Sequence, residues 1–175
     1  MPKFEELINQ GLPARIRSNH ALEHATLHVL GEQGFKGHLS GISDVGGFYI
    51  YGDVPTEALL LAAKEGLKRL QGGEAGLAVH PNCGTNLVVG SLAAGGLAWA
   101  SMLGTKGRFS RRLRRLPVAV LAGLIGYQMA KPLGPKLQET ITTSADVGGL
   151  AVVEVDQHEL LGGTVHRVKT RYSQP

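Results

Sequence analysis

The sequence Asp-Val-Gly-Gly occurs twice, at residues 44–47 and 146–149, and these two copies decide the fold. Each copy leads into an apolar run, residues 48–51 after the first and residues 150–155 after the second. A Gly pair favours a turn or a bulge, and an apolar run of this length favours a strand. The repeat therefore predicts two equivalent strand entries, which we expect to be neighbours in one sheet.

Two segments on the N-terminal side have the pattern of amphipathic helices. Residues 55–70 begin with Pro55 and are followed by a Gly pair, which is typical of a helix start and stop. Residues 18–30 carry apolar residues at helical spacing, and Ser18 or Asn19 can cap this second helix.

Two further segments complete the predicted sheet. Residues 75–79 are apolar and look like a strand, and residues 164–172 alternate in the manner of a last strand after the turn at Gly162 and Gly163. The expected order is helix, strand, helix, strand, apolar hairpin, strand, strand. This order predicts an α+β fold with a small mixed sheet and two amphipathic helices, interrupted by an apolar helical hairpin.

The hairpin consists of two apolar segments, residues 87–103 and 116–130, separated by a basic loop at residues 105–117. Small residues recur every four positions, as in Gly90, Ala94 and Ala98, and such rows let membrane helices approach closely. Charged residues make up only 18% of the chain, below the usual quarter, which also favours a membrane segment. The alternative is a hairpin buried in a soluble oligomer, because segments shorter than about 20 residues are ambiguous.

The basic loop carries six Lys and Arg residues and no acidic residue. In a membrane protein such a loop favours the cytoplasmic side, or it binds anionic headgroups while the two helices only dip into the bilayer. The N-terminal residues 1–11 are polar and lack the features of a signal peptide, so the side of the membrane stays open. Nucleic acid is the least favoured partner, since the loop has one aromatic residue and no recognised motif.

We expect three regions: residues 1–86 as an N-terminal α/β part, residues 87–134 as the hairpin, and residues 135–175 as strands that complete the sheet. The single cysteine excludes an internal disulfide framework.

Histidines and a glutamate occur at a chemically informative spacing in the predicted helix 18–30. His20 and His24 lie four residues apart, so both imidazoles can face one ion, and Glu23 lies on the same side. The pattern H-x-x-E-H resembles that of the inverzincin metallopeptidases, in which two His bind zinc and the Glu handles a water proton. His28 continues the row. The alternative is a helix whose His and Glu residues hydrogen-bond to one another on a polar face.

A second cluster follows at residues 80–86, which read His-Pro-Asn-Cys-Gly-Thr-Asn. His80 and Cys83 are both of types that bind metals, and a lone thiol near a His can also be a nucleophile. The alternative is a tight turn in which Asn82 and Asn86 bond to the main chain. We expect this cluster to pack beside His20 and His24, because a shared ion would satisfy the polar groups of both.

Three stretches, residues 18–26, 46–54 and 80–86, resemble the signature segments of an uncharacterised bacterial family of small proteins with predicted membrane helices. The resemblance implies a membrane-associated bacterial protein, in the cytoplasmic or a thylakoid-like inner membrane, and implies no activity.

Three classes of function are consistent with these residues. The first is a membrane-associated, zinc-dependent hydrolase, such as a small peptidase, with His20 and His24 as ligands, His80 or Cys83 as a third ligand and Glu23 as the general base. The second is a non-catalytic metal or redox-cofactor binding protein of the membrane, in which His20, His24, His80 and Cys83 would form a closed, structural metal site. The third is an accessory or assembly subunit of a membrane complex, or a homo-oligomer, whose hairpin packs against partner helices or lipids.

Overall fold

The computed structural model describes residues 4–35, 37–104, 109–160 and 162–172. The chain forms two compact units. Met1–His80 and Gln138–Pro175 together form the first, which we call the sheet unit, and Pro81–Leu137 form the second, the hairpin unit.

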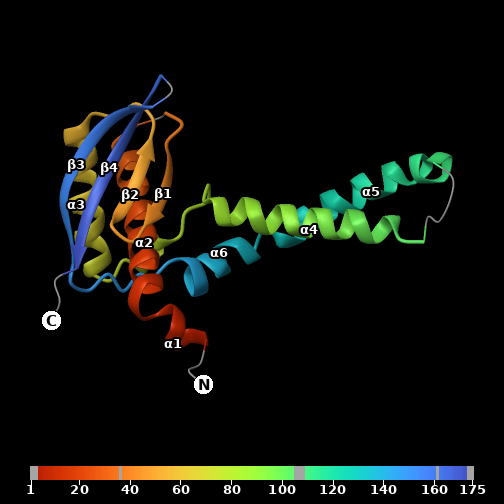
Figure 1. Ribbon diagram of the computed structural model, residues 1–175, viewed down its shortest axis with the longest axis horizontal. Coiled ribbons are helices and arrows are strands. Elements are labelled where there is room, and N and C mark those ends of the chain that lie inside the picture. The colour runs from red at the N-terminus through yellow and green to blue at the C-terminus, as the bar shows by residue number, and fades with distance from the viewer. Residues whose placement is uncertain (1–3, 36, 105–108, 161, 173–175) are drawn as a thin grey trace. The chain divides into compact units, whose positions relative to one another are not determined.

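The sheet unit combines helices with one four-stranded sheet (Figure 1). In chain order its elements are α1 (Phe4–Ile8), α2 (Gly11–Glu32), β1 (Ser40–Asp44), β2 (Gly47–Tyr51), α3 (Thr56–Gln71), the 3-10 helix η1 (Ala75–Ala78), the π-helical turn η2 (Gln138–Thr142), β3 (Leu150–Leu160) and β4 (Gly163–Tyr172). The strand order is β1-β2-β4-β3, and every pair is antiparallel. The α+β class is confirmed, but the prediction of a mixed sheet is wrong, because each half of the sheet is a hairpin whose strands must run in opposite directions.

The two Asp-Val-Gly-Gly copies enter the same sheet, but they are not neighbours, because β4 lies between β2 and β3. Both copies share one hydrogen bond between the Asp side chain and the main chain two residues ahead. The main-chain N–H of Gly46 donates to Oδ1 of Asp44 at 2.8 Å, and that of Gly148 donates to Oδ1 of Asp146 at 3.2 Å. Short polar side chains that bond to the main chain two residues ahead favour such turns.

Helix α2 holds both turns with two consecutive side chains. Nδ2 of Asn19 donates to the carbonyl of Asp44 at 2.7 Å, and Oγ of Ser18 donates to the carbonyl of Asp146 at 3.2 Å. The sequence predicted that Ser18 or Asn19 caps this helix, and that prediction is wrong. The helix already begins at Gly11, and these side chains are buried against the turns, where their hydrogen bonds satisfy carbonyl groups.

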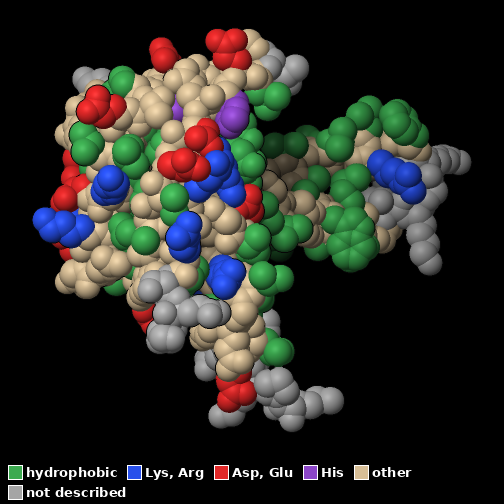
Figure 2. All heavy atoms as spheres, turned by 60° about the vertical axis from the view of Figure 1, so that its left-hand side comes forward, with side chains coloured by type: hydrophobic (Ala, Val, Ile, Leu, Met, Phe, Trp, Pro, Cys, Tyr) green, Lys and Arg blue, Asp and Glu red, His purple; other side chains and the backbone are tan. Residues whose placement is uncertain are grey.

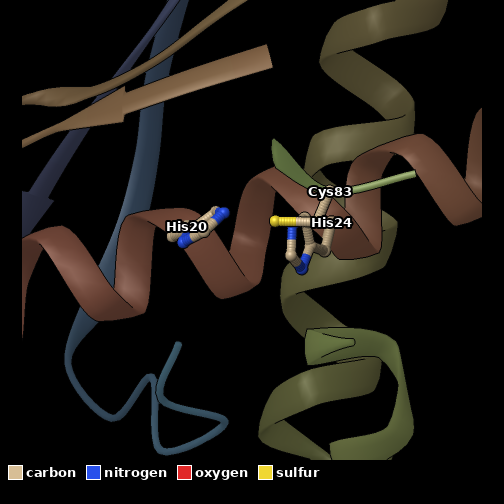
Figure 3. A group of neighbouring side chains, drawn as sticks. All are labelled: His20, His24 and Cys83. Carbon is tan, nitrogen blue, oxygen red and sulfur yellow. The ribbon is translucent and has the colours of Figure 1, made fainter. Parts of the chain in front are cut away.

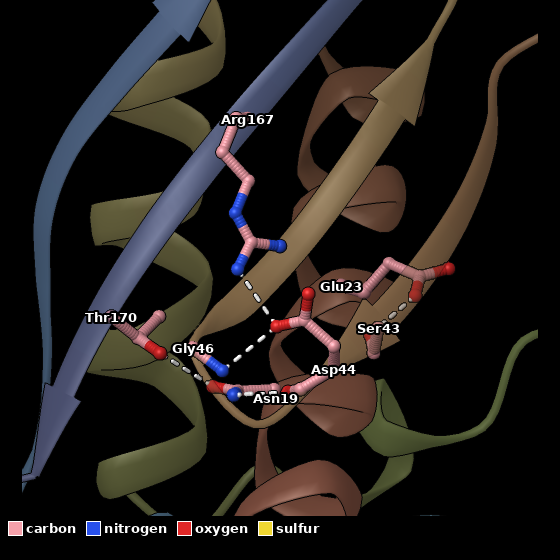
Figure 4. A network of polar contacts seen from close by, with 7 residues as sticks. All are labelled: Asn19, Glu23, Ser43, Asp44, Gly46, Arg167 and Thr170. Atoms are coloured by element: carbon pink, nitrogen blue, oxygen red, sulfur yellow. Dashed lines mark hydrogen bonds and ion pairs between the residues drawn. The ribbon is translucent and has the colours of Figure 1, made fainter.

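Around the first turn the polar contacts continue into β4 (Figure 4). Nη2 of Arg167 pairs with Oδ1 of Asp44 at 2.7 Å, and the guanidinium also lies over the ring of Tyr49, 4.3 Å from its centroid. Burial opposes ionisation of Asp44, but the bonds from Arg167 and from the main chain of Gly46 outweigh it and lower the pKa of this carboxyl. The network joins α2, the β1–β2 turn and β4 into one body.

The hydrophobic core lies between the sheet and the two helices α2 and α3. Phe48 and Ile50 of β2 are fully buried, as are Leu22 of α2 and Leu59 of α3. The two helices approach closely where Gly66 of α3 meets Ala25 of α2, since a Cβ at position 66 would lie 3.1 Å from Ala25. The predicted helix at residues 55–70 is confirmed as α3, with Pro55 as its N-cap.

Residues 75–79 do not form the predicted strand. Ala75–Ala78 form the 3-10 helix η1, and Val79 follows in an extended conformation. As a result, the carbonyls of Ala78 and Val79 point at α2 instead of at a neighbouring strand, and they accept hydrogen bonds from its histidines. This departure from the predicted strand shapes the candidate site.

The hairpin unit consists of α4 (Gly84–Met102), α5 (Phe109–Ala130) and α6 (Leu133–Leu137). Small residues line the contact between α4 and α5, so that a Cβ at Gly126 would lie 2.6 Å from the carbonyl oxygen of Ala93. The outer surface is apolar: Leu92 is 71% exposed, Trp99 68% and Met129 68%. In Figure 2, hydrophobic side chains gather over the hairpin, which also carries basic side chains, and charged side chains of both signs are spread over the sheet unit.

No single helix among the described residues has the length and apolar character needed to cross a membrane. Arg112–Ala130 and Leu133–Thr142 meet the requirement only as a pair bent by 50°. Of the predicted basic loop at 105–117, residues 105–108 lie outside the described residues, and the rest belong to the first turns of α5.

Candidate metal site

Four histidines of the sheet unit lie in a row. Helix α2 supplies His20, His24 and His28 at intervals of four residues, and His80 follows η1. The ring centroids are 4.4 Å apart for His20 and His24, 5.7 Å for His24 and His80, and 4.9 Å for His28 and His80. Two imidazoles on one zinc ion have centroids roughly 5 Å apart, because each Zn–N bond is about 2 Å. The observed spacing therefore suits shared metal ligation.

Main-chain carbonyls fix the orientation of three of these rings. Nδ1 of His20 donates to the carbonyl of Thr142 at 2.9 Å, Nδ1 of His24 to that of Ala78 at 2.7 Å, and Nε2 of His28 to that of Val79 at 2.8 Å. A carbonyl oxygen only accepts, so the nitrogen that faces it carries the proton and the opposite nitrogen of the neutral ring carries a lone pair. Metal-binding histidines are usually held in this way.

His24 is the most informative member of the row. Its side chain is 1% exposed, and its Nε2 is buried without a hydrogen-bond partner among the described residues. An unsatisfied buried acceptor costs about 1–3 kcal/mol, so proteins seldom leave one without a role. A metal ion at this nitrogen would remove the cost.

The surroundings of His80 favour its neutral form. Burial, followed by the charges of His28 and His24, lowers the pKa of His80 to about 4. Neutral imidazole is the form that binds a metal, so His80 needs no deprotonation step at neutral pH.

Cys83 lies in the hairpin unit, three residues after His80. It is the N-cap of α4, and its Sγ accepts a hydrogen bond from the main-chain N–H of Thr85 at 3.4 Å. Nδ2 of Asn86 donates to the carbonyl of Pro81 at 2.7 Å, so the segment also forms the tight turn weighed as an alternative. His20 and His24, which project from successive turns of α2 (Figure 3), are two residues of a group that could hold a metal ion.

Glu23, the predicted general base, faces β1. Its side chain is buried, and its Oε2 accepts a hydrogen bond from Oγ of Ser43 at 2.6 Å (Figure 4). Burial raises the pKa of this carboxyl, while the bond from Ser43 and the charge of His20 act in the opposite direction. The base role of Glu23 stays a prediction.

Two buried residues that the sequence did not single out shape the site. Gln138 is 0% exposed and bonds to both main-chain groups of His80. Arg17 is 8% exposed and donates to the carbonyls of Thr140 and Thr143, which stabilises the turn that carries the Thr142 carbonyl. Arg17 lies one turn before the first site histidine on α2, which is the only signal the sequence offers for either residue.

The fold and the site thus define a two-unit α+β protein with a row of histidines, of which His24 is buried, and an exposed apolar hairpin. Residues 15–155 match the domain of unknown function DUF6391, and the chain belongs to this family. An uncharacterized protein of the cyanobacterium Picosynechococcus sp. is 34% identical over 172 residues, which cover 90% of this chain and 80% of that protein. No solved structure matches the chain. The resemblance to an uncharacterised bacterial family is therefore confirmed, while the local resemblance to inverzincins stays a prediction.

Proposed function

We propose that this protein is a metal-binding protein that holds zinc with His20 and His24, and that His80 or Cys83 supplies a further ligand. The observation that carries the proposal is the buried Nε2 of His24, which lacks a partner among the described residues in the middle of a row of imidazoles. Neutral His nitrogens and a thiolate are the ligands that zinc prefers.

The orientation of the rings supports the same proposal. Hydrogen bonds to the Thr142 and Ala78 carbonyls direct Nε2 of His20 and Nε2 of His24 away from the main chain. These two nitrogens come from successive turns of one rigid helix, so their spacing needs no rearrangement on binding. A site as buried as His24 favours a closed, non-catalytic metal site over an open one.

A metal-dependent hydrolase is the second candidate, and Glu23 is the observation that favours it. Its carboxyl is buried, interacts with His20 and has a raised pKa, as expected of a general base that must exchange a proton near neutral pH. Bound zinc would supply an activated water, and Glu23 would accept the proton of that water. The hydrolase requires that Glu23 give up its bond to Ser43 or share it.

We further propose that the hairpin unit associates with a membrane. Its support is the apolar outer surface, on which Leu92, Trp99 and Met129 are each more than two-thirds exposed. In water such a surface costs about 25 cal/mol per Å², and insertion between lipid acyl chains removes that cost. The arginines at the start of α5 would lie near anionic headgroups.

The metal proposal is tested by titrating the metal-free protein with Co²⁺, whose absorption reports coordination geometry and thiolate ligation. We expect saturable binding by the wild type and a loss of at least about 100-fold in affinity for His24→Ala, because a ligand is removed. His158→Ala, an exposed histidine on β3, is the matched control and should bind as the wild type does.

The same titration distinguishes the two candidates. Loss of the thiolate absorption in Cys83→Ser would show that Cys83 is a ligand. Hydrolysis of a peptide library by the zinc-loaded wild type, abolished in Glu23→Gln with binding intact, would favour the hydrolase. A wild type that binds neither Co²⁺ nor Zn²⁺ contradicts both candidates and leaves an accessory subunit of a membrane complex.

A further inference from the structure

The chain returns to the sheet unit at Gln138, and this residue is fully buried. Its Oε1 accepts a hydrogen bond from the main-chain N–H of His80 at 2.8 Å, and its Nε2 donates to the carbonyl of His80 at 3.2 Å. One side-chain amide therefore satisfies both main-chain groups of one residue, as a strand partner would. This pair of bonds fixes the direction in which the Cα–Cβ bond of His80 points.

The turn that carries Gln138 is itself held firmly. The N–H and Oγ1 of Thr143 both donate to the carbonyl of Gln138 at 2.9 Å. Nη2 of Arg17 donates to the carbonyl of Thr143 at 2.8 Å and to that of Thr140 at 3.2 Å. Because these bonds are largely buried, Gln138 cannot turn away without leaving several polar groups unsatisfied.

The far end of the same turn orients a second histidine. The carbonyl of Thr142 accepts the hydrogen bond from Nδ1 of His20 at 2.9 Å. The π-helical turn Gln138–Thr142 thus contacts His80 through a side chain and His20 through a carbonyl. π-Helical turns are rare and occur frequently at functional sites.

We propose that Gln138 is a positioning residue of the metal site, which keeps the His80 imidazole in line with His24 by fixing the main chain of His80. The proposal rests on the proposed function, since it assigns a role within that metal site. The competing explanation is that Gln138 only closes the base of the hairpin insertion and contributes to stability. The two explanations predict different effects of a Gln138 substitution on metal affinity once the His80 imidazole has been removed by His80→Ala.

The test uses Gln138→Met, which keeps the length of the side chain and removes both hydrogen bonds. Loss of a group that orients a ligand typically weakens metal binding by about 10–100-fold, and we expect this for Co²⁺. Gln71→Met is the matched control, since Nε2 of Gln71 also donates to a main-chain carbonyl, that of Leu150 at 3.3 Å, outside the site. Its Co²⁺ affinity should stay within about two-fold of the wild type.

A double-mutant cycle separates positioning from stability. If Gln138 acts through the His80 imidazole, then adding Gln138→Met to His80→Ala should weaken Co²⁺ binding by no more than about two-fold. The same full loss in both backgrounds overturns the proposal. Amide hydrogen exchange of His80 provides a readout without metal: it should be slow in the wild type and in Gln71→Met, and fast in Gln138→Met.

The Co²⁺ titrations distinguish a failure of the proposed metal site from a failure of the proposed role of Gln138. A wild type that binds no Co²⁺ overturns the metal site and the role of Gln138 together. A wild type that binds Co²⁺ with an unchanged affinity in Gln138→Met overturns only the positioning role.

Discussion

The two units of this protein differ in the polar side chains that one buries and the apolar side chains that the other exposes. In the sheet unit, polar residues such as Asn19, His24 and Thr26 are at most 1% exposed, whereas in the hairpin unit Leu92 and Trp99 are at least 68% exposed. The buried polar groups belong to a specific hydrogen-bond network, in which each loss has a large cost. The exposed apolar groups have no such network. The contrast places the specific buried polar contacts in the sheet unit, and the exposed apolar surface of the hairpin is the reason for proposing that it associates with a membrane.

The largest expected loss of stability comes from a substitution in the buried polar network of the sheet unit. Asn19→Leu removes the bond to the Asp44 carbonyl and the one that Oγ1 of Thr170 donates to Asn19, at 2.8 Å. Two unsatisfied groups should lower the free energy of unfolding by about 3 kcal/mol, measured by urea titration with circular dichroism. The matched change in the hairpin, Leu92→Asn, should alter it by less than about 0.5 kcal/mol. Equal effects would contradict the contrast between the units.

The basic start of α5 should matter only for a membrane surface. Arg112→Gln with Arg114→Gln should weaken binding to anionic vesicles by about 2 kcal/mol, roughly 30-fold, because each basic residue near such a surface adds about 1 kcal/mol. The chain contains one tryptophan, Trp99, so its emission reports binding directly. Lys64→Gln with Lys68→Gln, on α3 of the sheet unit, should leave the affinity unchanged. Binding that is equally strong to neutral vesicles would show that charge has no part in it.

Close packing within the hairpin gives a smaller effect. Gly126→Ala places a Cβ 2.6 Å from the carbonyl oxygen of Ala93 and should destabilise the hairpin by about 1.5 kcal/mol. At Gly95 of α4 a Cβ would have no atom within 4 Å among the described residues, and Gly95→Ala should stabilise the helix by up to about 1 kcal/mol. Thermal unfolding followed by Trp99 emission measures both. A stabilised Gly126→Ala would mean that α4 and α5 do not pack as observed.

The smallest effect is a dependence of stability on pH. His166 on β4 is 0% exposed, and burial lowers its pKa, partly offset by the charge of Asp53. The unfolded chain then binds a proton at this histidine at higher pH than the folded chain, so the contribution of His166 to stability is constant above about pH 6.5 and falls as the pH drops below it. One such group contributes at most about 1.4 kcal/mol per pH unit. His80 acts in the same direction between its ordinary pKa and about 4.

The control for this dependence is the exposed His158 on β3. Urea midpoints between pH 7 and pH 5 should fall less in His166→Leu than in the wild type, and His158→Leu should follow the wild type. Parallel curves for all three proteins would exclude His166 as a source of the dependence.

Sequence periodicity correctly predicted α3 and the helical row of His20, His24 and His28, since both follow from residues within a few turns of one helix. It also pointed to two strand entries at the repeated turns. It failed at residues 75–79, because a short apolar run is equally compatible with a strand and with a buried 3-10 turn. Ser18 and Asn19 were misread as caps, because a polar residue inside a buried helix face has the same local pattern as a helix start.

Only part of the candidate site could be predicted from the sequence. The chemistry of His80 marked it as a candidate ligand, but nothing local indicates that its ring lies against His24 and His28. Gln138 has no local signal at all, because its role depends on a main-chain partner 58 positions away.

The sequence by itself determined the helical row of histidines, the apolar hairpin and the repeated Asp-Val-Gly-Gly turns, because spacing along the chain sets which side chains share a face. Only the tertiary structure decided that α2 holds both turns, that β4 separates β2 from β3, and that η1 and the Gln138–Thr142 turn orient the histidines. These features depend on which segments, far apart in the sequence, pack against one another, and on which group each buried polar atom bonds to.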